Sequence, residues 1–247
     1  MTDGFTRKII ASAFARMGPA HREHVAGMIE RNYEAITYRR LAGLGYQPSA
    51  IIDVGAYQGN WTLSARRIFG PAPSLMVEAQ SALIPNLERI ASENRDVAVA
   101  HAVLGARDGD TVEFFEMGTG SSFFPETSNA PRRATPLVTH RLDDIVANWR
   151  GQLDNAFLKI DVQGAELEVL AGGMQVLAGC SLVQLELAML AYNEGAPLLP
   201  QVVDWMAQHH WLPTEVSGFS RPRNRLVQID MLFAPKDSHL RPTRFEF

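Results

Sequence analysis

Five charged residues end or interrupt apolar runs of the sequence. Asp53 and Glu78 close the first two runs, Lys159 and Asp161 alternate with apolar residues in a third, and Glu186 closes a fourth. Charges are costly in a protein interior unless they are paired or used. Because the carboxyl ends of parallel strands meet at one edge of a sheet, where open α/β proteins bind ligands, these side chains could converge on one site.

A glycine-containing turn after Asp53 would shape the first part of such a site. Gly55 and Gly59 bracket the turn, and an amphipathic segment begins at Asn60. The glycines let a ligand approach the main chain, and the start of the helix offers unpaired N–H groups to an anionic group. The spacing differs from G-x-G-x-x-G, which disfavours a nicotinamide or flavin dinucleotide, and the sequence has no Walker-type phosphate loop.

Two further strand ends could complete a nucleotide-like site. Glu78 follows Gly55 by 23 residues, close to the offset of about 20 residues at which an acid binds ribose hydroxyls in dinucleotide folds. A solvated surface glutamate is the alternative. Val103 and Leu104 end the next strand and offer apolar walls that would suit adenine, although an ordinary strand end fits them equally well.

The later part of the chain holds the groups that could act as acids or bases. Lys159 is expected to pair with Asp161 or Glu186, either for function or as a purely structural ion pair, and Glu186 could face Asp161 across the cleft. His140 has an ordinary pKa near neutrality that would suit a base, with a surface or capping role as the alternative. Ser122 lies in a stretch of small residues that could close over a ligand.

Strands alternate with helices from residue 50 onward, which predicts a parallel sheet. The expected strands are 50–54, 74–78, 97–104, 111–117, 136–139, 157–162, 182–187, 212–216 and 227–233. The expected helices are 60–69, 81–93, 142–149, 164–177 and 198–210. The Gly-, Ser-, Pro- and Thr-rich segment 118–135 is predicted to be a long loop, and loops of that length are usually functional or disordered.

The N-terminal residues differ from the rest, since they have helical spacing and no strand. They predict two units, an N-terminal helical cap or lid at 1–47 and a catalytic domain at 48–247. The helical region either packs against the sheet or closes over the ligand, in which case Tyr33 or Tyr38 would reach the substrate.

Composition places the chain among ordinary soluble proteins. It has 247 residues, of which 46% are hydrophobic and 20% charged. The net charge of −4 gives no general attraction to nucleic acid or an anionic membrane. No apolar run is long enough to span a bilayer, and we expect a cytoplasmic protein. The single cysteine, Cys180, and the scattered carboxylates predict no metal site.

These stretches together resemble the FkbM family of S-adenosylmethionine-dependent methyltransferases. The matching blocks run in family order and are 52–59, 77–79, 103–109, 120–122, 141–144, 158–166 and 169–172. The block at 158–166, which reads LKIDVQGAE, is the most specific. One departure is Ala79, where family members often have proline, and the N-terminal 46 residues have no counterpart.

The resemblance implies a Rossmann-like class I methyltransferase fold. That α/β fold has a seven-stranded, mostly parallel sheet whose last strand is antiparallel, here with an N-terminal helical cap. The implied cofactor is S-adenosyl-L-methionine, with its methionine part on the glycine turn, its ribose on Glu78 and its adenine near Val103. The predicted cofactor-binding residues are Asp53, Val54, Gly55, Ala56, Gly59, Asn60, Trp61, Glu78, Ala79, Val103, Leu104 and Ser122.

The resemblance also implies O-methylation of a sugar or natural-product scaffold. An aliphatic hydroxyl must lose its proton as it attacks, so in-line transfer needs a base. Asp161 is the first candidate, His140 and Glu186 come next, and Lys159 completes the predicted catalytic set. The expected partner is a small-molecule acceptor with a sugar or polyketide-like hydroxyl, and the oligomeric state is open. The alternatives are a non-catalytic protein that binds the cofactor and a nicotinamide-dependent oxidoreductase.

Overall fold

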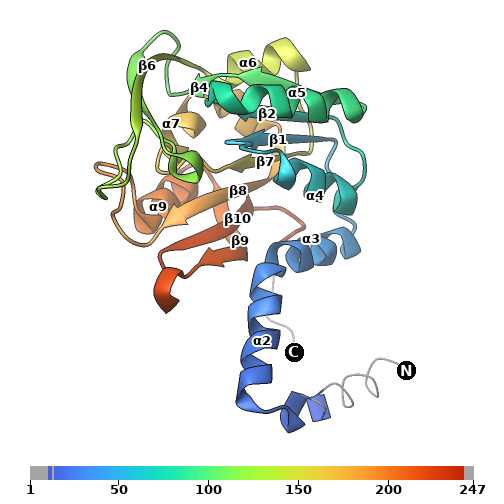
Figure 1. The fold of residues 1–247 in the computed structure, drawn as a ribbon. Helices are drawn as coiled ribbons and strands as arrows, with labels where there is room; N and C mark the ends of the chain where they lie inside the picture. Colours follow the sequence, from blue (N-terminus) through green and yellow to red (C-terminus); the bar gives the residue numbers. More distant parts are fainter. Residues whose placement is uncertain (1–10, 13, 242–247) are drawn as a thin grey trace.

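The computed structural model describes residues 11–12 and 14–241 of the chain. Its centre is a seven-stranded sheet in the order β3-β2-β1-β7-β8-β10-β9 (Figure 1). The strands are β1 (Ala50–Val54), β2 (Ser74–Glu78), β3 (Val97–His101), β7 (Ala156–Ile160), β8 (Cys180–Ala188), β9 (Trp211–Ser220) and β10 (Gln228–Pro235). The last strand, β10, runs antiparallel to both of its neighbours, whereas the pairs from β3 to β8 are parallel. The predicted sheet is confirmed.

Helices cover both faces of this sheet because its central strands are apolar on both sides. Successive side chains of a strand point to opposite faces, so Ile51 packs in one apolar cluster and Ile52 in another. One face carries α3 (Tyr33–Gly43), α4 (Asn60–Phe69) and α5 (Ile84–Glu93). The other carries α6 (Leu142–Trp149), α7 (Glu166–Ala171), α8 (Met174–Ala178) and α9 (Leu199–Gln208). Short 3₁₀ turns lie at Ser81–Leu83, Gly118–Gly120 and Pro222–Asn224.

The N-terminal helices are arranged differently from one another. Helix α2 (Pro19–Arg31) projects from the body of the molecule and buries none of its residues (Figure 1). Helix α3 packs against α4 and β9. Tyr38 of α3 is fully buried, with ring centroids 5.3 Å from Phe69 and 5.5 Å from Phe157. Tyr38 is therefore a core residue. Residues 1–10 and 13 of the predicted cap lie outside the described part of the chain.

A smaller sheet stands beside the carboxyl ends of the main strands. It has the order β4-β6-β5 and consists of β4 (Val103–Leu104), β5 (Thr111–Glu116) and β6 (Arg133–His140). The predicted strand 97–104 is therefore two strands, because the chain leaves the main sheet at Ala102. The N–H of Ala102 makes a last hydrogen bond to the main sheet, at the Glu78 carbonyl oxygen. Strand β6 begins before the predicted residue 136 because its first residues pair with β5.

The predicted helix 164–177 is wrong in one respect, since α7 and α8 are separated at Gly172 and Gly173. A Cβ on Gly172 would lie 2.1 Å from the Gly105 carbonyl oxygen. The break lets the chain pass closely over the turn after β4. Among the described residues, every helix is too short or too polar to cross a bilayer.

Candidate active site

A cavity of about 630 Å³ opens where the strands of the main sheet end. That size lies within the range of small-molecule sites. Its lining includes the turns after β1, β2 and β7, the end of β8, and a roof formed by the loop between β5 and β6. The predicted residues that line it are Val54, Gly55, Ala56, Asn60, Trp61, Glu78, Ala79, Val103, Leu104, Ser122, Lys159, Asp161 and Glu186.

The glycine turn is held tightly between the ends of β2 and β7. Gly55 has φ +78°, and a Cβ there would lie 1.9 Å from the Asp161 carbonyl oxygen. Its N–H donates to the Val77 carbonyl oxygen at 3.0 Å. Tyr57 also has a positive φ of 49°, which is strained for a residue with a side chain. Glycine at position 55 therefore serves a close approach of two main chains at the edge of the cavity.

Glu78 is fixed by the main chain on both sides of its carboxylate. Its Oε2 accepts the Tyr57 N–H at 2.7 Å, and its Oε1 accepts the Gln80 N–H at 2.8 Å. The residue is 4% exposed and lines the cavity. Oε1 also accepts the Gln80 side-chain Nε2–H at 3.3 Å, whereas Oε2 keeps a further acceptor site, so the group remains competent to bind a ligand hydroxyl. Tyr57 and Gln80 line the cavity too, although no sequence pattern singles them out.

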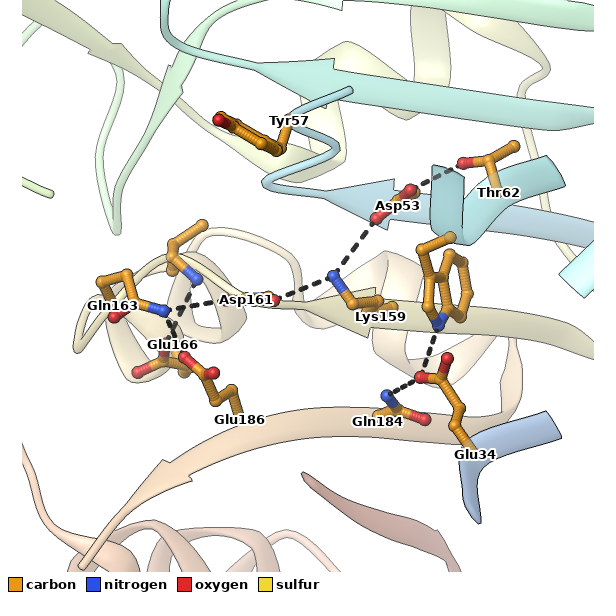
Figure 2. A network of polar contacts seen from close by, with 12 residues as sticks. Glu34, Asp53, Tyr57, Thr62, Lys159, Asp161, Gln163, Glu166, Gln184 and Glu186 are labelled. Atoms are coloured by element: carbon orange, nitrogen blue, oxygen red, sulfur yellow. Dashed lines mark hydrogen bonds and ion pairs between the residues drawn. The ribbon is translucent and has the colours of Figure 1, made fainter. Parts of the chain in front are cut away.

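A buried ion pair joins β1 to β7 at the wall of the cavity, and Figure 2 shows its contacts. Asp53 and Lys159 are register partners on β1 and β7, and the Lys159 Nζ lies 3.6 Å from Asp53 Oδ1 and 3.2 Å from Asp161 Oδ2. Asp53 Oδ2 also accepts the Thr62 hydroxyl at 2.6 Å. Burial disfavours the ammonium, but the carboxylates of Asp161 and Asp53 outweigh this and raise the pKa of Lys159. Lys159 therefore pairs with Asp161, one of its two expected partners, and with Asp53 instead of Glu186.

Two neighbouring carboxyl groups, those of Asp161 and Glu186, line the cavity beside this ion pair. The Gln163 amide donates to Asp161 Oδ1 at 3.1 Å and to Glu186 Oε2 (Figure 2). Burial would raise the pKa of Asp161, but the Lys159 ammonium outweighs it and holds that pKa below its ordinary value. Burial and the Asp161 carboxylate together raise the pKa of Glu186 well above its ordinary value. The pKa values of these two neighbouring carboxyl groups are thus shifted in opposite directions.

The roof of the cavity consists of two paired loops. The Thr127 N–H donates to the Tyr192 carbonyl oxygen at 2.7 Å, and the Glu194 N–H donates to the Pro125 carbonyl oxygen at 2.8 Å. The buried Asn193 amide donates to the Gln163 carbonyl oxygen below them. None of the described residues of α2 or α3 lines the cavity. The loop that includes the predicted Ser122 therefore contributes to the lining, whereas the described residues of the N-terminal helices do not.

Three predicted site residues lie away from the cavity lining. His140 is on β6 with 46% of its side chain exposed, and its Nδ1 lies 3.0 Å from Asp108 Oδ1. Gly59 has φ +76°, and a Cβ there would lie 2.9 Å from the Ile90 side chain, so glycine is needed for packing of α4 on α5. Asp53 is fully buried behind Lys159. The structure thus separates His140 from the acids with which it was grouped.

Comparison with known proteins assigns the chain to a family. Residues 53–211 match the sequence model of the methyltransferase FkbM domain, which is more than half of the chain. The chain belongs to the FkbM methyltransferase family. The matched region includes the glycine turn, the acid of β2 and the block around Asp161, and it ends at the start of β9. No curated protein matches the sequence significantly.

Solved methyltransferases are similar to this FkbM protein at low sequence identity. A putative RNA methyltransferase from Pyrococcus horikoshii is 12% identical, with 83% of each chain covered and a TM-score of 0.44. A Burkholderia thailandensis 1,6-didemethyltoxoflavin-N1-methyltransferase, crystallised with 1,6-didemethyltoxoflavin and S-adenosylhomocysteine, is 13% identical over 95% of this chain and 89% of that one, with a TM-score of 0.43. A precorrin-6y C5,15-methyltransferase from Geobacter metallireducens is 12% identical over 82% and 85%, with a TM-score of 0.44. These values are too low to carry an argument about the acceptor.

Proposed function

We propose that this FkbM protein is an S-adenosyl-L-methionine-dependent O-methyltransferase that acts on a hydroxyl of a sugar or natural-product scaffold. The charge of the cavity is the observation that carries the proposal. Carboxylates of Glu78, Glu126, Asp161 and Glu186 line it, and Lys159 is the single cation among the described lining residues. Such a wall favours a cationic sulfonium ligand and disfavours a dinucleotide with two phosphates. It therefore argues against the nicotinamide-dependent alternative.

The residues present fit this cofactor at three points. The main chain of the Gly55 turn lines the cavity and carries no side chain there, because it lies directly against the Asp161 carbonyl oxygen. Glu78 keeps acceptor capacity for ribose hydroxyls, and Val77, Leu104 and Phe114 give an apolar wall suited to adenine. When bound, S-adenosylmethionine supplies an already activated methyl group. The chain must then provide alignment, a dry site and a proton acceptor.

We assign the proton acceptor to the carboxyl pair of Asp161 and Glu186, with Glu186 as the base. Asp161 is held as the partner of Lys159, and its lowered pKa makes it a weak base. Glu186 lines the same cavity, and burial together with the Asp161 carboxylate raises its pKa, which makes its ionised form a stronger base than Asp161. Asp161 then keeps the acid pair oriented through Gln163. His140 has no part in this proposal because it lies outside the cavity.

Calorimetry with S-adenosylhomocysteine and a turnover assay test this proposal together. The turnover assay follows release of S-adenosylhomocysteine from S-adenosylmethionine over a panel of sugars and hydroxylated scaffolds. Glu186→Gln should lower kcat roughly 100-fold or more while it leaves the affinity for S-adenosylhomocysteine nearly unchanged. Equal losses of turnover and of binding would contradict the assignment of the base. Binding without turnover on any acceptor would favour the non-catalytic alternative.

A further inference from the structure

Glu34 of α3 lies outside the family-matched residues, yet its carboxylate contacts Trp61, which lines the cavity (Figure 2). Its Oε1 accepts the indole Nε1–H of Trp61 at 3.0 Å and the side-chain Nε2–H of Gln184 at 2.9 Å. A carboxylate that binds an indole and an amide from two other elements, α4 and β8, ties α3 to both. Hydrogen bonds to an ionised acceptor are stronger than those between neutral groups.

Trp61 connects this contact to the ion pair at the wall of the cavity. The Lys159 Nζ lies 5.5 Å from the centroid of the Trp61 indole, within the distance at which an aromatic face attracts a cation. The ring also packs on Phe157 at 5.4 Å. Its N–H end is held by Glu34 and by the Tyr38 hydroxyl oxygen at 2.8 Å. Trp61 itself lines the cavity.

The ammonium supported by Trp61 is the same one that pairs with Asp161. That contact is 3.2 Å long, and Asp161 continues through Gln163 to Glu186 (Figure 2). A shift of the indole would therefore change the position of the ammonium and then that of the two carboxyl groups. In-line transfer is sensitive to such shifts, because small displacements of reacting groups have large effects on rate.

We propose that Glu34 is a positioning residue for methyl transfer, which holds the Trp61 indole and through it the Lys159 ammonium and the Asp161 carboxylate. The inference rests on the proposed function of the cavity. It gives α3 a role in supporting the active site from below the sheet edge, which differs from the role of a lid.

Two variants of Glu34 and a control that loosens the same helix test the proposal. Glu34→Ala removes the acceptor, whereas Glu34→Gln keeps an acceptor oxygen at the same length. The control is Glu215→Gln, which breaks the exposed ion pair between Glu215 and Arg40 and so weakens the hold on α3 at another point. Glu34→Ala should lower kcat roughly tenfold with little change in the affinity for S-adenosylhomocysteine. Glu34→Gln should recover most of that loss, and Glu215→Gln should match the wild type.

Two readouts separate positioning from a general loss of stability. Asp161 and Glu186 titrate as a pair, so a weaker hold of the ammonium on Asp161 should raise the pKa of the pair, and the acid limb of the pH profile of kcat should move to higher pH in Glu34→Ala. Trp61→Phe keeps an aromatic face and removes the N–H. If Glu34 acts through Trp61, the effects of Glu34→Ala and Trp61→Phe on kcat will not add in the double variant. Additive effects, or an unshifted pH profile, would overturn the proposal.

A third readout needs no methyl transfer. Hydrogen exchange of the Trp61 indole N–H, assigned with Trp61→Phe, should be protected in the wild type and in Glu215→Gln, and faster in Glu34→Ala. Unchanged protection in Glu34→Ala would show that Glu34 does not hold the indole. Failure of the proposed function would look different, since the wild-type chain would then either not bind S-adenosylhomocysteine or show no turnover on any acceptor, whatever the protection of the Trp61 indole.

Discussion

Lys159 is the residue on which the floor of the site depends, because it is the cation between the carboxylates of Asp53 and Asp161. Its side chain is 9% exposed, and that of Asp53 is fully buried. Buried ion pairs add little net stability by themselves, but removal of one partner leaves an uncompensated charge. An apolar core would avoid the free-energy cost of burying these charges. Retention of a buried ion pair despite that cost is typical of a functional site.

Lys159→Met should consequently destabilise the chain by about 3–5 kcal/mol, because Asp53 and Asp161 would remain buried without a counterion. Urea unfolding followed by circular dichroism measures the free energy of unfolding. Arg107→Met is the matched control, since it removes the exposed Arg107–Asp110 pair at 2.9 Å and should leave stability nearly unchanged. Asp53→Asn combined with Lys159→Met should recover part of the loss. If Lys159→Met were as stable as Arg107→Met, this account of the ion pair would be refuted.

Gly55 is the second residue whose identity the site requires, for two separable reasons. Its φ is +78°, and a Cβ would meet the Asp161 carbonyl oxygen at 1.9 Å. Gly109 has φ +86° with open space around it. Gly109→Ala should therefore cost about 1 kcal/mol for the backbone conformation alone. Gly55→Ala should cost clearly more in urea unfolding and should also weaken the binding of S-adenosylhomocysteine, since the clash displaces the end of β7. Equal losses in the two variants would show that the close approach is unimportant.

At the scale of elements, the sequence predicted those parts whose signals are local. The strands at Asp53 and Glu78 and the helix beginning at Leu142 have the predicted bounds, because apolar periodicity and turn residues determine them within a few positions. The break at Gly172 was missed because its cause is Gly105, a residue distant in sequence.

The same limit explains which site residues the sequence could identify. Acids and glycines at strand ends were recognisable by type and spacing. Glu34 was not, because its importance depends on contacts with Trp61 and Gln184 that only the tertiary fold creates. His140 was grouped with the acids on chemical type alone, and the pairing of β6 with β4 and β5 places it elsewhere.

Because two paired loops form the roof of the cavity, a substitution that loosens them should reduce activity toward the acceptor selectively. Asn193 is 3% exposed and its amide donates to the carbonyl oxygen of Gln163, which has a positive φ of 54°. Asn193→Ala should loosen both the roof and Gln163, so kcat/KM for the acceptor should fall roughly 10- to 100-fold with little change in S-adenosylhomocysteine affinity. Ser128→Ala, at an exposed position on the other roof loop, between β5 and β6, is the control and should behave as the wild type. If Asn193→Ala mainly weakened cofactor binding, the roof would belong to the cofactor instead.

At the scale of the whole molecule, the concentration of carboxyl groups at one sheet edge should determine how stability depends on pH. Burial raises the pKa of Glu166 from 4.5 to about 7 and that of Asp230 from 3.8 to about 7, and Glu186 is raised in the same direction. Between the ordinary and the raised values, the folded chain binds more protons than the unfolded chain. Stability should therefore fall as pH rises from about 4 to about 7 and then level off. The lowered pKa of Asp161 affects stability only at pH values below this range.

Thermal unfolding across this range tests that dependence, with a melting temperature several degrees higher near about pH 5.5 than near about pH 8 as the expected result. Asp230→Asn and Glu166→Gln should each flatten the curve, because each removes one of the shifted groups. In Glu166→Gln the new amide oxygen could still accept the Gly164 N–H, which the native carboxylate accepts at 3.1 Å. Glu113→Gln, at an exposed position on β5, should leave the slope unchanged. A melting temperature that rises from the acidic to the alkaline condition would mean that these carboxyl groups are not held protonated in the folded chain, and it would also weaken the assignment of Glu186 as a base with a raised pKa.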